Sequence, residues 1–290
     1  MDTTERLKLL ADTLGLKEKI RIVDVGANPI GGDAPYKPLL DADLCHLTGF
    51  EPHPEAYENL LKVKGDAETY HNVAVGDGNS HKLKIYGASG FTSIFKLDEN
   101  SADLMGLPEG WRRMVSEVEL DTVRLDDIEE IEAIDFLKID IQGGELAVFR
   151  NSRNKLSKAL AIQTEIRFLR LYENEPDFGE VNMELIGQGF EMHSLVSSVK
   201  WALSCSEKDK FHRRARRQLI DGDMIYVREV RRLAKYTDLQ LKKLAVLADG
   251  VFESFELAVL CIDILAERNP ELEGFAKVYV DTVPEFFRSR

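Results

Sequence analysis

IRIVDVGAN, residues 20–28, is the stretch of sequence that decides the fold. Its first six residues are dominated by isoleucine and valine, which favour a buried β-strand. Gly26 follows at once, and glycine tolerates the tight turn that a chain makes on leaving such a strand. The segment therefore predicts a strand over 20–25 that opens into a close-fitting loop.

Strand and helix patterns alternate along the chain on both sides of this segment. Strands are predicted near residues 46–51, 69–78, 134–141, 160–166, 189–195 and 221–228, a hairpin over 81–95, and helices over 4–16, 33–44, 54–65 and 143–156. Residues 97–117 are expected to be irregular and charged, as a mobile loop or a short helix. The alternation predicts an α/β, Rossmann-like fold with a mostly parallel sheet, and the last two strands are expected to form an antiparallel edge.

The character of the sequence changes near residue 231. Thr237 and Gln240 fit a helix capping box, and two strongly apolar helical stretches follow before Pro270. We therefore expect residues 1–230 to form the main domain and residues 231–290 a C-terminal helical appendage. The apolar faces of that appendage are suited to a homodimer.

The loop GANPIG, residues 26–31, resembles the Gly-x-Gly-x-x-Gly fingerprint of dinucleotide sites, with Asn28 at the middle glycine. The middle glycine lets the backbone approach a pyrophosphate. S-adenosylmethionine has no pyrophosphate, so its site tolerates a side chain there. In this interpretation Asp24 either orients the loop or meets the methionine ammonium.

A second acidic residue strengthens the interpretation of the loop. Glu51 ends the next predicted strand, and an acid roughly 20 residues beyond the glycine turn is where ribose hydroxyls are held. A carboxylate accepts hydrogen bonds from both hydroxyls at once. Together with Gly26, Glu51 favours a nucleoside-containing cofactor over a purely structural turn.

Composition limits the partners and the compartment. The chain has 38 basic and 51 acidic residues, a formal charge of −13, and such a field disfavours binding to nucleic acid. One basic cluster, Arg213 to Arg217, reads as a solvated surface or as a docking site for an anion. Three cysteines without metal-type spacing, a charged N-terminus and no long apolar run predict a cytoplasmic protein with no membrane span.

Seven blocks of the sequence occur in an order that resembles the FkbM family of methyltransferases. They are VDVGANPIGG, GFEPHPEAYENLL, NVAVGDG, GFTSIF, LDTVRLDDI, IDFLKIDIQGGELAVF and TEI, and they span about residues 20–228. The resemblance implies the class I methyltransferase fold, S-adenosylmethionine as cofactor, and transfer of a methyl group to a hydroxyl of a small molecule, often a sugar or polyketide.

The resemblance also implies roles for individual residues. It places Asp24, Gly26 and Asn28 on the methionine side and Glu51 on the ribose. Asn72 and Val73 would border the adenine, and Asp140 would lie near the transferred methyl. The chain departs from the family's Lys-Ile-Asp-Val-Glu-Gly pattern, because Gln142 stands where many members have a carboxylate.

Two residues are candidates for the base that removes the hydroxyl proton. Asp140 is the first and His193 the second, while Asp140 could instead bind the cofactor or cap the next helix. Lys138 lies two positions before Asp140 and could pair with it or with Glu165. No metal is expected, although Asp140, Glu145 and Glu165 could together hold a divalent cation. The side chains of Tyr36, Lys37, Thr92 and Ser93 could line the acceptor pocket.

Two other functions remain open at this level. A nicotinamide-dependent oxidoreductase would also use a glycine turn and Glu51, although Asn28 and the lack of a Tyr-x-x-x-Lys pair speak against it. A catalytically silent, methyltransferase-like binding module would retain the fold and lose the chemistry, and Gln142 favours that alternative. The leading prediction is an S-adenosylmethionine-dependent O-methyltransferase acting on a small-molecule or glycan hydroxyl.

Overall fold

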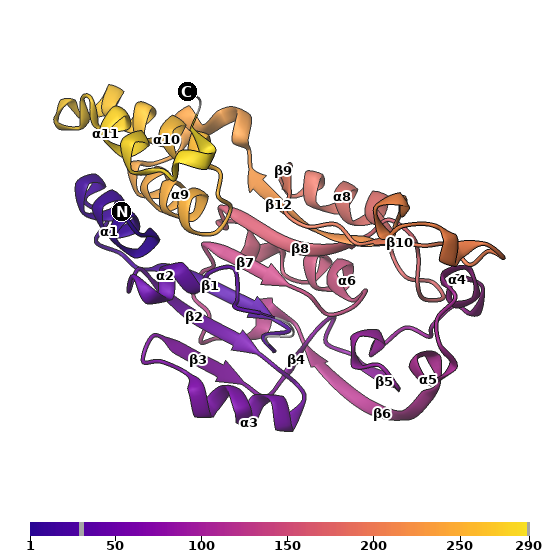
Figure 1. The fold of residues 1–290 in the computed structure, drawn as a ribbon. Helices are drawn as coiled ribbons and strands as arrows, with labels where there is room; N and C mark the ends of the chain where they lie inside the picture. Colours follow the sequence, from indigo (N-terminus) through magenta and orange to yellow (C-terminus); the bar gives the residue numbers. More distant parts are fainter. Residues whose placement is uncertain (29–31, 289–290) are drawn as a thin grey trace.

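The computed structural model describes residues 1–28 and 32–288. Its centre is a seven-stranded sheet in the order β3-β2-β1-β7-β8-β12-β9. The strands are β1 (Ile20–Val25), β2 (Cys45–Phe50), β3 (Glu68–His71), β7 (Phe136–Ile139), β8 (Ala161–Arg167), β9 (Phe190–Leu195) and β12 (Asp221–Arg228). β3, β2, β1, β7 and β8 run parallel, and β12 is antiparallel to both its neighbours. The predicted α/β fold is confirmed, and so is the antiparallel pairing of the last two strands, with β9 at the edge and β12 beside it (Figure 1).

A small second sheet extends the molecule beyond the carboxyl ends of the parallel strands (Figure 1). It contains β4 (Ala74–Val75), β5 (Ser80–Tyr86) and β6 (Met114–Val123) in the order β4-β6-β5. The predicted hairpin over 81–95 is wrong, because β5 pairs along its length with β6 and only a single bridge joins Lys84 to Ser93. The predicted strand over 69–78 is broken at Asn72 into β3 and β4.

Of the two predictions for residues 97–117, a loop or a short helix, the structure favours the helix. It contains α4 (Glu99–Met105), α5 (Glu109–Arg112) and the start of β6. The side chain of Asp98 caps α4 by accepting from the backbone N–H of Ser101, and Gly106 ends it with φ 60°. These two cap residues favour a helix between them, although the polar composition of the segment favours a loop.

Helices cover both faces of the central sheet. One apolar cluster joins α1 (Thr3–Leu14), α2 (Lys37–Asp41), α9 (Asp238–Gly250), α10 (Phe255–Arg268) and α11 (Phe275–Thr282) to the first face. The second face packs against α6 (Glu145–Arg150), α7 (Arg153–Leu156) and α8 (Phe178–Gly187). α3 (Pro54–Val63) follows β2, while β10 (Lys200–Trp201) and β11 (Gln218–Leu219) lie in the connection between β9 and β12.

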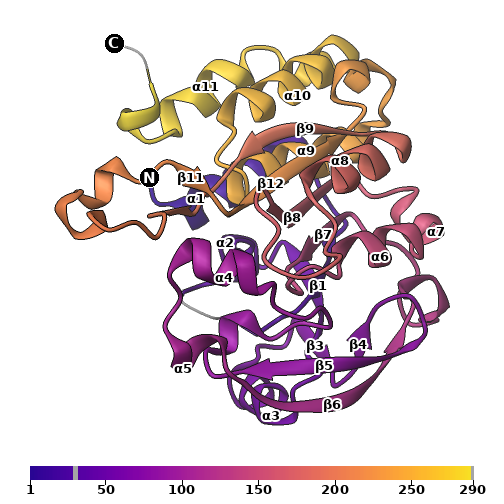
Figure 2. The ribbon, with the colours of Figure 1, turned by 90° about the vertical axis from the view of Figure 1, so that its right-hand side faces the viewer.

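The helices after residue 231 form a layer on the sheet (Figure 2). Their buried residues belong to the same cluster as Ile22 of β1, Phe136 of β7 and Ile225 of β12. The capping box predicted at Thr237 and Gln240 is present at the start of α9. The expected appendage therefore packs on one face of the sheet, over the buried apolar residues of β1, β7 and β12.

Buried ion pairs reinforce this packing. Arg6 of α1 donates from Nε to the carboxylate of Asp249 at 2.8 Å, and Tyr279 of α11 donates to the same carboxylate at 2.7 Å. Lys243 of α9 donates to Asp135, just before β7, at 2.9 Å. These buried hydrogen bonds connect α1 and α11 to α9, and α9 to the start of β7 in the sheet. Within residues 1–28 and 32–288, no helix is both long and apolar enough to cross a bilayer.

Candidate active site

Four acidic residues meet where the parallel strands end. Asp24 is the last residue but one of β1, Glu51 follows β2, Asp140 follows β7, and Glu165 lies near the end of β8. The carboxyl ends of these strands lie at one edge of the sheet, where open α/β proteins bind their ligands. The prediction that all four fall at this edge agrees with the strand bounds.

Gly26 makes the turn between β1 and the loop that follows. Its φ is 81°, and a Cβ atom there would come within 2.2 Å of the carbonyl oxygen of Asp140. The backbone N–H of Asp140 also donates to the carbonyl of Val25 at 3.0 Å. Only glycine permits so close an approach of the first loop to the end of β7. Of the loop's sequence-predicted residues, Asn28 is exposed, and the part at 29–31 lies outside the described residues.

Asp24 is enclosed by its neighbours. Tyr36 donates a hydrogen bond to Asp24 Oδ2 at 2.6 Å, and the Lys138 ammonium lies 3.2 Å from Oδ1. Lys138 also donates to the carbonyl of Gly26 at 3.1 Å. Of the two roles considered for Asp24, this geometry favours orienting the loop. Lys138 forms neither of its expected pairs, with Asp140 or Glu165, because Asp24 is its ion-pair partner.

Burial shapes the protonation of this pair. It raises the pKa of Asp24, and the Lys138 ammonium and the Tyr36 hydroxyl oppose that rise. The pKa of Lys138 is also raised, since the Asp24 and Asp140 carboxylates outweigh the opposing effect of burial. Lys138 therefore stays charged at neutral pH and fixes the carbonyl of the glycine turn.

Glu51 is presented at the end of β2 with its carboxylate partly held. Oε1 accepts from the backbone N–H of His53 at 2.8 Å, and the residue is 6% exposed. Burial raises its pKa, opposed first by the His53 N–H. Asn72 donates to the carbonyls of Glu51 and Pro52 at 2.9 and 3.0 Å. Asn72 thus fixes the chain that leaves β2, and Val73 beside it packs against the core.

Three carboxylates gather around the end of β7. Oxygen atoms of Asp140, Glu145 and Glu165 lie within 4.8 Å of one another. Glu145, at the start of α6, accepts from the backbone N–H groups of Ile141 at 2.9 Å and Gly143 at 3.0 Å. Asp140 Oδ1 accepts from the Gln142 amide at 2.9 Å. Within the described residues, no hydrogen bond reaches Asp140 Oδ2.

Arg167 is the positive charge of the cluster, and sequence reasoning missed it. Its guanidinium lies 2.8 Å from Glu165 and donates to Glu175 at 2.9 Å, to Asp221 at 2.7 Å and to Gln142 Oε1 at 2.6 Å. The residue is 4% exposed. A basic residue after a strand reads as surface charge, and its partners are spread from residue 142 to residue 221. The local sequence carries no signal for this network.

The crowding of acids raises their pKa values. Burial raises the pKa of Glu145 to about 7, and the Asp140 carboxylate adds to the effect. Burial also raises the pKa of Glu165 well above its usual range; Arg167 opposes the shift, and the Asp140 and Glu145 carboxylates reinforce it. Such shifts are typical of sites whose groups exchange protons with a substrate.

The remaining candidates lie in two places. Ser93 is buried and donates to the carbonyl of Gln142 at 2.6 Å, while Lys37 is half-buried and paired with Asp41. His193 lies on β9 and hydrogen-bonds Ser254 at 2.8 Å, at the N-terminus of α10. Burial lowers the pKa of this imidazole. The structure therefore gathers Asp24, Glu51 and Asp140 at one edge and places His193 against the helical layer.

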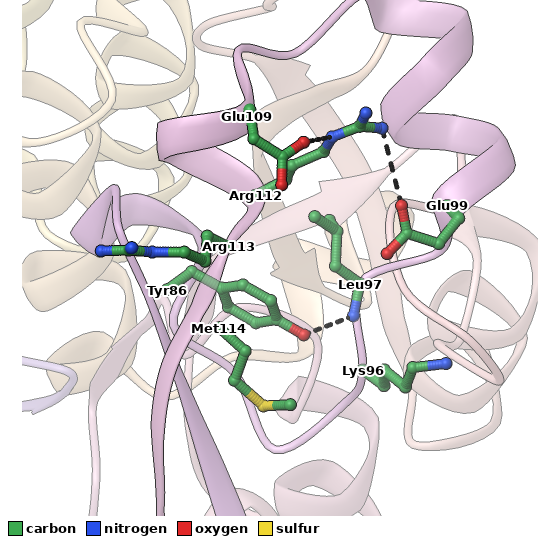
Figure 3. A pocket seen from close by; sticks show the side chains of 8 residues that line it. All are labelled: Tyr86, Lys96, Leu97, Glu99, Glu109, Arg112, Arg113 and Met114. Atoms are coloured by element: carbon green, nitrogen blue, oxygen red, sulfur yellow. Dashed lines mark hydrogen bonds and ion pairs between the residues drawn. The ribbon is translucent and has the colours of Figure 1, made fainter.

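A cavity of about 220 Å³ lies beside this edge, between the small sheet and α4 and α5 (Figure 3). Arg112 there is paired with Glu99 and Glu109, and the Tyr86 hydroxyl accepts from the backbone N–H of Leu97 at 2.8 Å. None of its eight lining residues is one of the sequence-predicted site residues. The cavity is distinct from the strand-end site.

The family model of the methyltransferase FkbM domain matches residues 24–192. The chain belongs to the FkbM methyltransferase family. The match spans both the glycine turn and the carboxylate cluster, so the resemblance drawn from the sequence blocks is confirmed. The protein is accordingly a methyltransferase of class I fold, with S-adenosylmethionine as its cofactor.

Three solved structures with loosely similar folds illustrate how distant the structural matches are. A precorrin-6y C5,15-methyltransferase from Geobacter metallireducens is 14% identical, with 77% of this chain and 89% of that chain covered and a TM-score of 0.36. Fibrillarin from Methanococcus jannaschii is 12% identical, with 74% of this chain and 68% of that chain covered and a TM-score of 0.37. Magnesium protoporphyrin IX methyltransferase from Synechocystis, solved with bound cofactor, is 9% identical, with 78% of this chain and 77% of that chain covered and a TM-score of 0.34. These values say nothing of the acceptor. No curated protein matches the sequence.

The residues present fit S-adenosylmethionine. Gly26 lets the first loop pack against the end of β7, and the buried carboxylate of Glu51, with one oxygen held by the His53 N–H, suits a ribose diol. The acidic surroundings of Asp140 suit a cationic ligand. When bound, this cofactor supplies an electrophilic methyl group on a positively charged sulfur.

Proposed function

We propose that this methyltransferase transfers its methyl group to a hydroxyl oxygen of a small molecule or glycan, with Asp140 as the proton acceptor. The observation that carries the proposal is the placement of Asp140. Its backbone touches the glycine turn, Gln142 holds one carboxylate oxygen, and no hydrogen bond within the described residues reaches the other. A group so placed can meet an acceptor hydroxyl beside the cofactor.

The chain's own residues then have separate tasks. Glu51 would hold the ribose, while Asp24 and Lys138 fix the loop around Gly26. Asp140 Oδ2 would take the hydroxyl proton as the acceptor oxygen forms its bond to the methyl carbon and the carbon–sulfur bond breaks. The rate gained comes chiefly from alignment, with proton removal contributing about 10²- to 10⁴-fold.

Family membership bears on one of the two alternatives that the sequence left open. It favours methyl transfer over a nicotinamide-dependent oxidoreductase. The silent binding module differs only in lacking turnover. Calorimetry with S-adenosylhomocysteine, followed by transfer of labelled methyl to a panel of sugars and other hydroxyl compounds, tests the proposal. Binding of a dinucleotide in place of S-adenosylhomocysteine, or binding without transfer to any acceptor, would contradict it.

Substitution of the two candidate bases sharpens the test. Asp140→Asn is expected to lower kcat by about 10²-fold or more and to change S-adenosylhomocysteine affinity little. His193→Gln, which disturbs the contact with Ser254, is expected to leave kcat within about threefold. The opposite pattern would assign the base to His193. Asp263→Asn, on the exposed side of α10, serves as the control.

A further inference from the structure

The side chain of Gln142 lies between two carboxylates of the site. Its Nε2 donates to Asp140 Oδ1 at 2.9 Å and to Glu165 Oε2 at 3.0 Å, and its Oε1 accepts from Arg167 at 2.6 Å. The reversed amide would place Oε1 against both carboxylates and Nε2 against the guanidinium. The orientation of the carboxamide is therefore fixed by its partners.

The backbone holds Gln142 in this place. Its φ is 57°, in the left-handed region that is unfavourable for a residue with a side chain. The buried Ser93 hydroxyl donates to its carbonyl at 2.6 Å, and Gly143 follows with φ 104°. A strained residue fixed from both the backbone and the side chain indicates a function for its position.

The neighbouring carboxylates are spaced as in a cation site. Oxygens of Asp140, Glu145 and Glu165 within 4.8 Å of one another repel unless positive charge or N–H donors lie among them. Glu145 is served by two backbone N–H groups, and Glu165 by Arg167. Between Asp140 and Glu165, the donor is the Gln142 amide.

We propose that the carboxamide of Gln142 takes the place of a divalent cation in this cluster. Gln142 is a positioning residue that bridges Asp140 and Glu165 and makes methyl transfer independent of metal. The inference rests on the proposed role of Asp140 as proton acceptor. It follows that Gln142→Glu, which removes the bridging N–H groups and adds a fourth carboxylate, converts the cluster into a divalent-cation site.

The experiment compares wild-type protein, Gln142→Glu and the matched control Gln188→Glu. Gln188 also donates its amide to a carboxylate, Glu184, and to a backbone carbonyl, but its partners lie on α6 and α8. Mn²⁺ binding is measured by electron paramagnetic resonance, S-adenosylhomocysteine affinity by calorimetry, and kcat in EDTA and in Mg²⁺. Wild type and Gln188→Glu are expected to show kcat values that agree within twofold in EDTA and Mg²⁺.

Gln142→Glu is expected to bind Mn²⁺ at least tenfold more tightly than wild type. Its kcat in EDTA should fall by about 10²-fold, with S-adenosylhomocysteine affinity within threefold, and Mg²⁺ should restore kcat at least tenfold. Loss of wild-type activity in EDTA with recovery in Mg²⁺ would overturn the proposal. So would a wild-type kcat for Gln142→Glu in EDTA, or Mn²⁺ affinity equal to that of wild type.

A second variant covers the case in which Gln142→Glu does not fold. Gln142→Met retains the length of the side chain without its donors, and it is expected to lose kcat at least tenfold with no rescue by Mg²⁺. A wild-type kcat in Gln142→Met would overturn the proposal. Mn²⁺ binding needs no acceptor, so it decides the role of Gln142 even if wild-type protein transfers methyl to nothing and the proposed function fails.

Discussion

Glu51 shows how one side chain can decide cofactor affinity. Its buried carboxylate is partly held by the His53 N–H, and in the proposed function it also accepts from the ribose. A hydrogen bond to a charged group contributes about 1.5–3 kcal/mol. We expect Glu51→Gln to weaken S-adenosylhomocysteine binding by about 10- to 100-fold in calorimetry. Glu55→Gln, on the exposed first turn of α3, is the control, and equal affinities in the two variants would remove Glu51 from the site.

Glu145 makes the stability of the protein depend on pH. Burial raises its pKa from 4.5 to about 7, so the folded state holds this proton more tightly than the unfolded chain does. Its contribution to stability is complete below pH 4.5 and is lost as the pH rises through about 7, in total about 3 kcal/mol. Urea unfolding at pH 5 and pH 8 should show that Glu145→Gln loses less stability over this interval than wild type. Equal losses would show that other groups dominate.

Individual site residues could be predicted where they stand at the end of a strand that the sequence pattern locates. Asp24, Gly26 and Glu51 stand at strand ends that the hydrophobic pattern locates, and Asp140 follows the most apolar strand. The network of Arg167 was not predictable, since Gln142 and Asp221 are brought to it by the register of β7, β8 and β12, and Glu175 by the segment that follows β8. The position of Gln142 as a donor between two carboxylates was not predictable either, because it depends on a left-handed backbone conformation that no sequence pattern indicates.

At the scale of elements, the buried parallel strands were predictable and the small sheet was not. In β6, Val118 and Leu120 alternate with Glu117, Glu119 and Asp121, but the strand is mostly exposed, and nothing in this short pattern indicates that its partner is β5. The glycine-rich stretch after β5 favoured a local hairpin, but β5 pairs with β6 from residue 114 onward. Long-range pairing overrode the local turn signal.

The contact between α1, α9 and α11 makes a prediction at the same scale. Asp249 accepts from Arg6 and Tyr279, and all three residues are at most 3% exposed. Asp249→Ala leaves the Arg6 charge buried without its partner, which costs about 3–5 kcal/mol. Urea unfolding should show a loss of that size, against less than about 0.5 kcal/mol for Asp263→Ala on α10. A loss below about 1 kcal/mol would mean that the helices are held by apolar packing alone.

At the scale of the whole molecule, the C-terminal helices bear on whether residues 1–230 can fold alone. Ile20 and Ile22 of β1, Phe136 of β7 and Ile225 of β12 share one apolar cluster with α9, α10 and α11. Without residues 231–290, this half of the sheet face would be exposed to water, at a cost of about 25 cal/mol for each Å² of apolar surface. The sequence marked the change of character at residue 231, but it could not show which surface the new helices cover.

We therefore expect a protein truncated after residue 230 to lose its native packing. Near-ultraviolet circular dichroism should be lost, binding of a hydrophobic dye should increase, and S-adenosylhomocysteine should no longer bind, because β1 and β7 position Gly26 and Asp140. The control is a protein truncated after residue 284, which retains α11 and should still bind S-adenosylhomocysteine. If the protein ending at residue 230 binds the cofactor with native affinity, the helices are an independent unit. Sedimentation of the full chain would then test whether their outer faces, with Leu260 and Val278 exposed, join two copies.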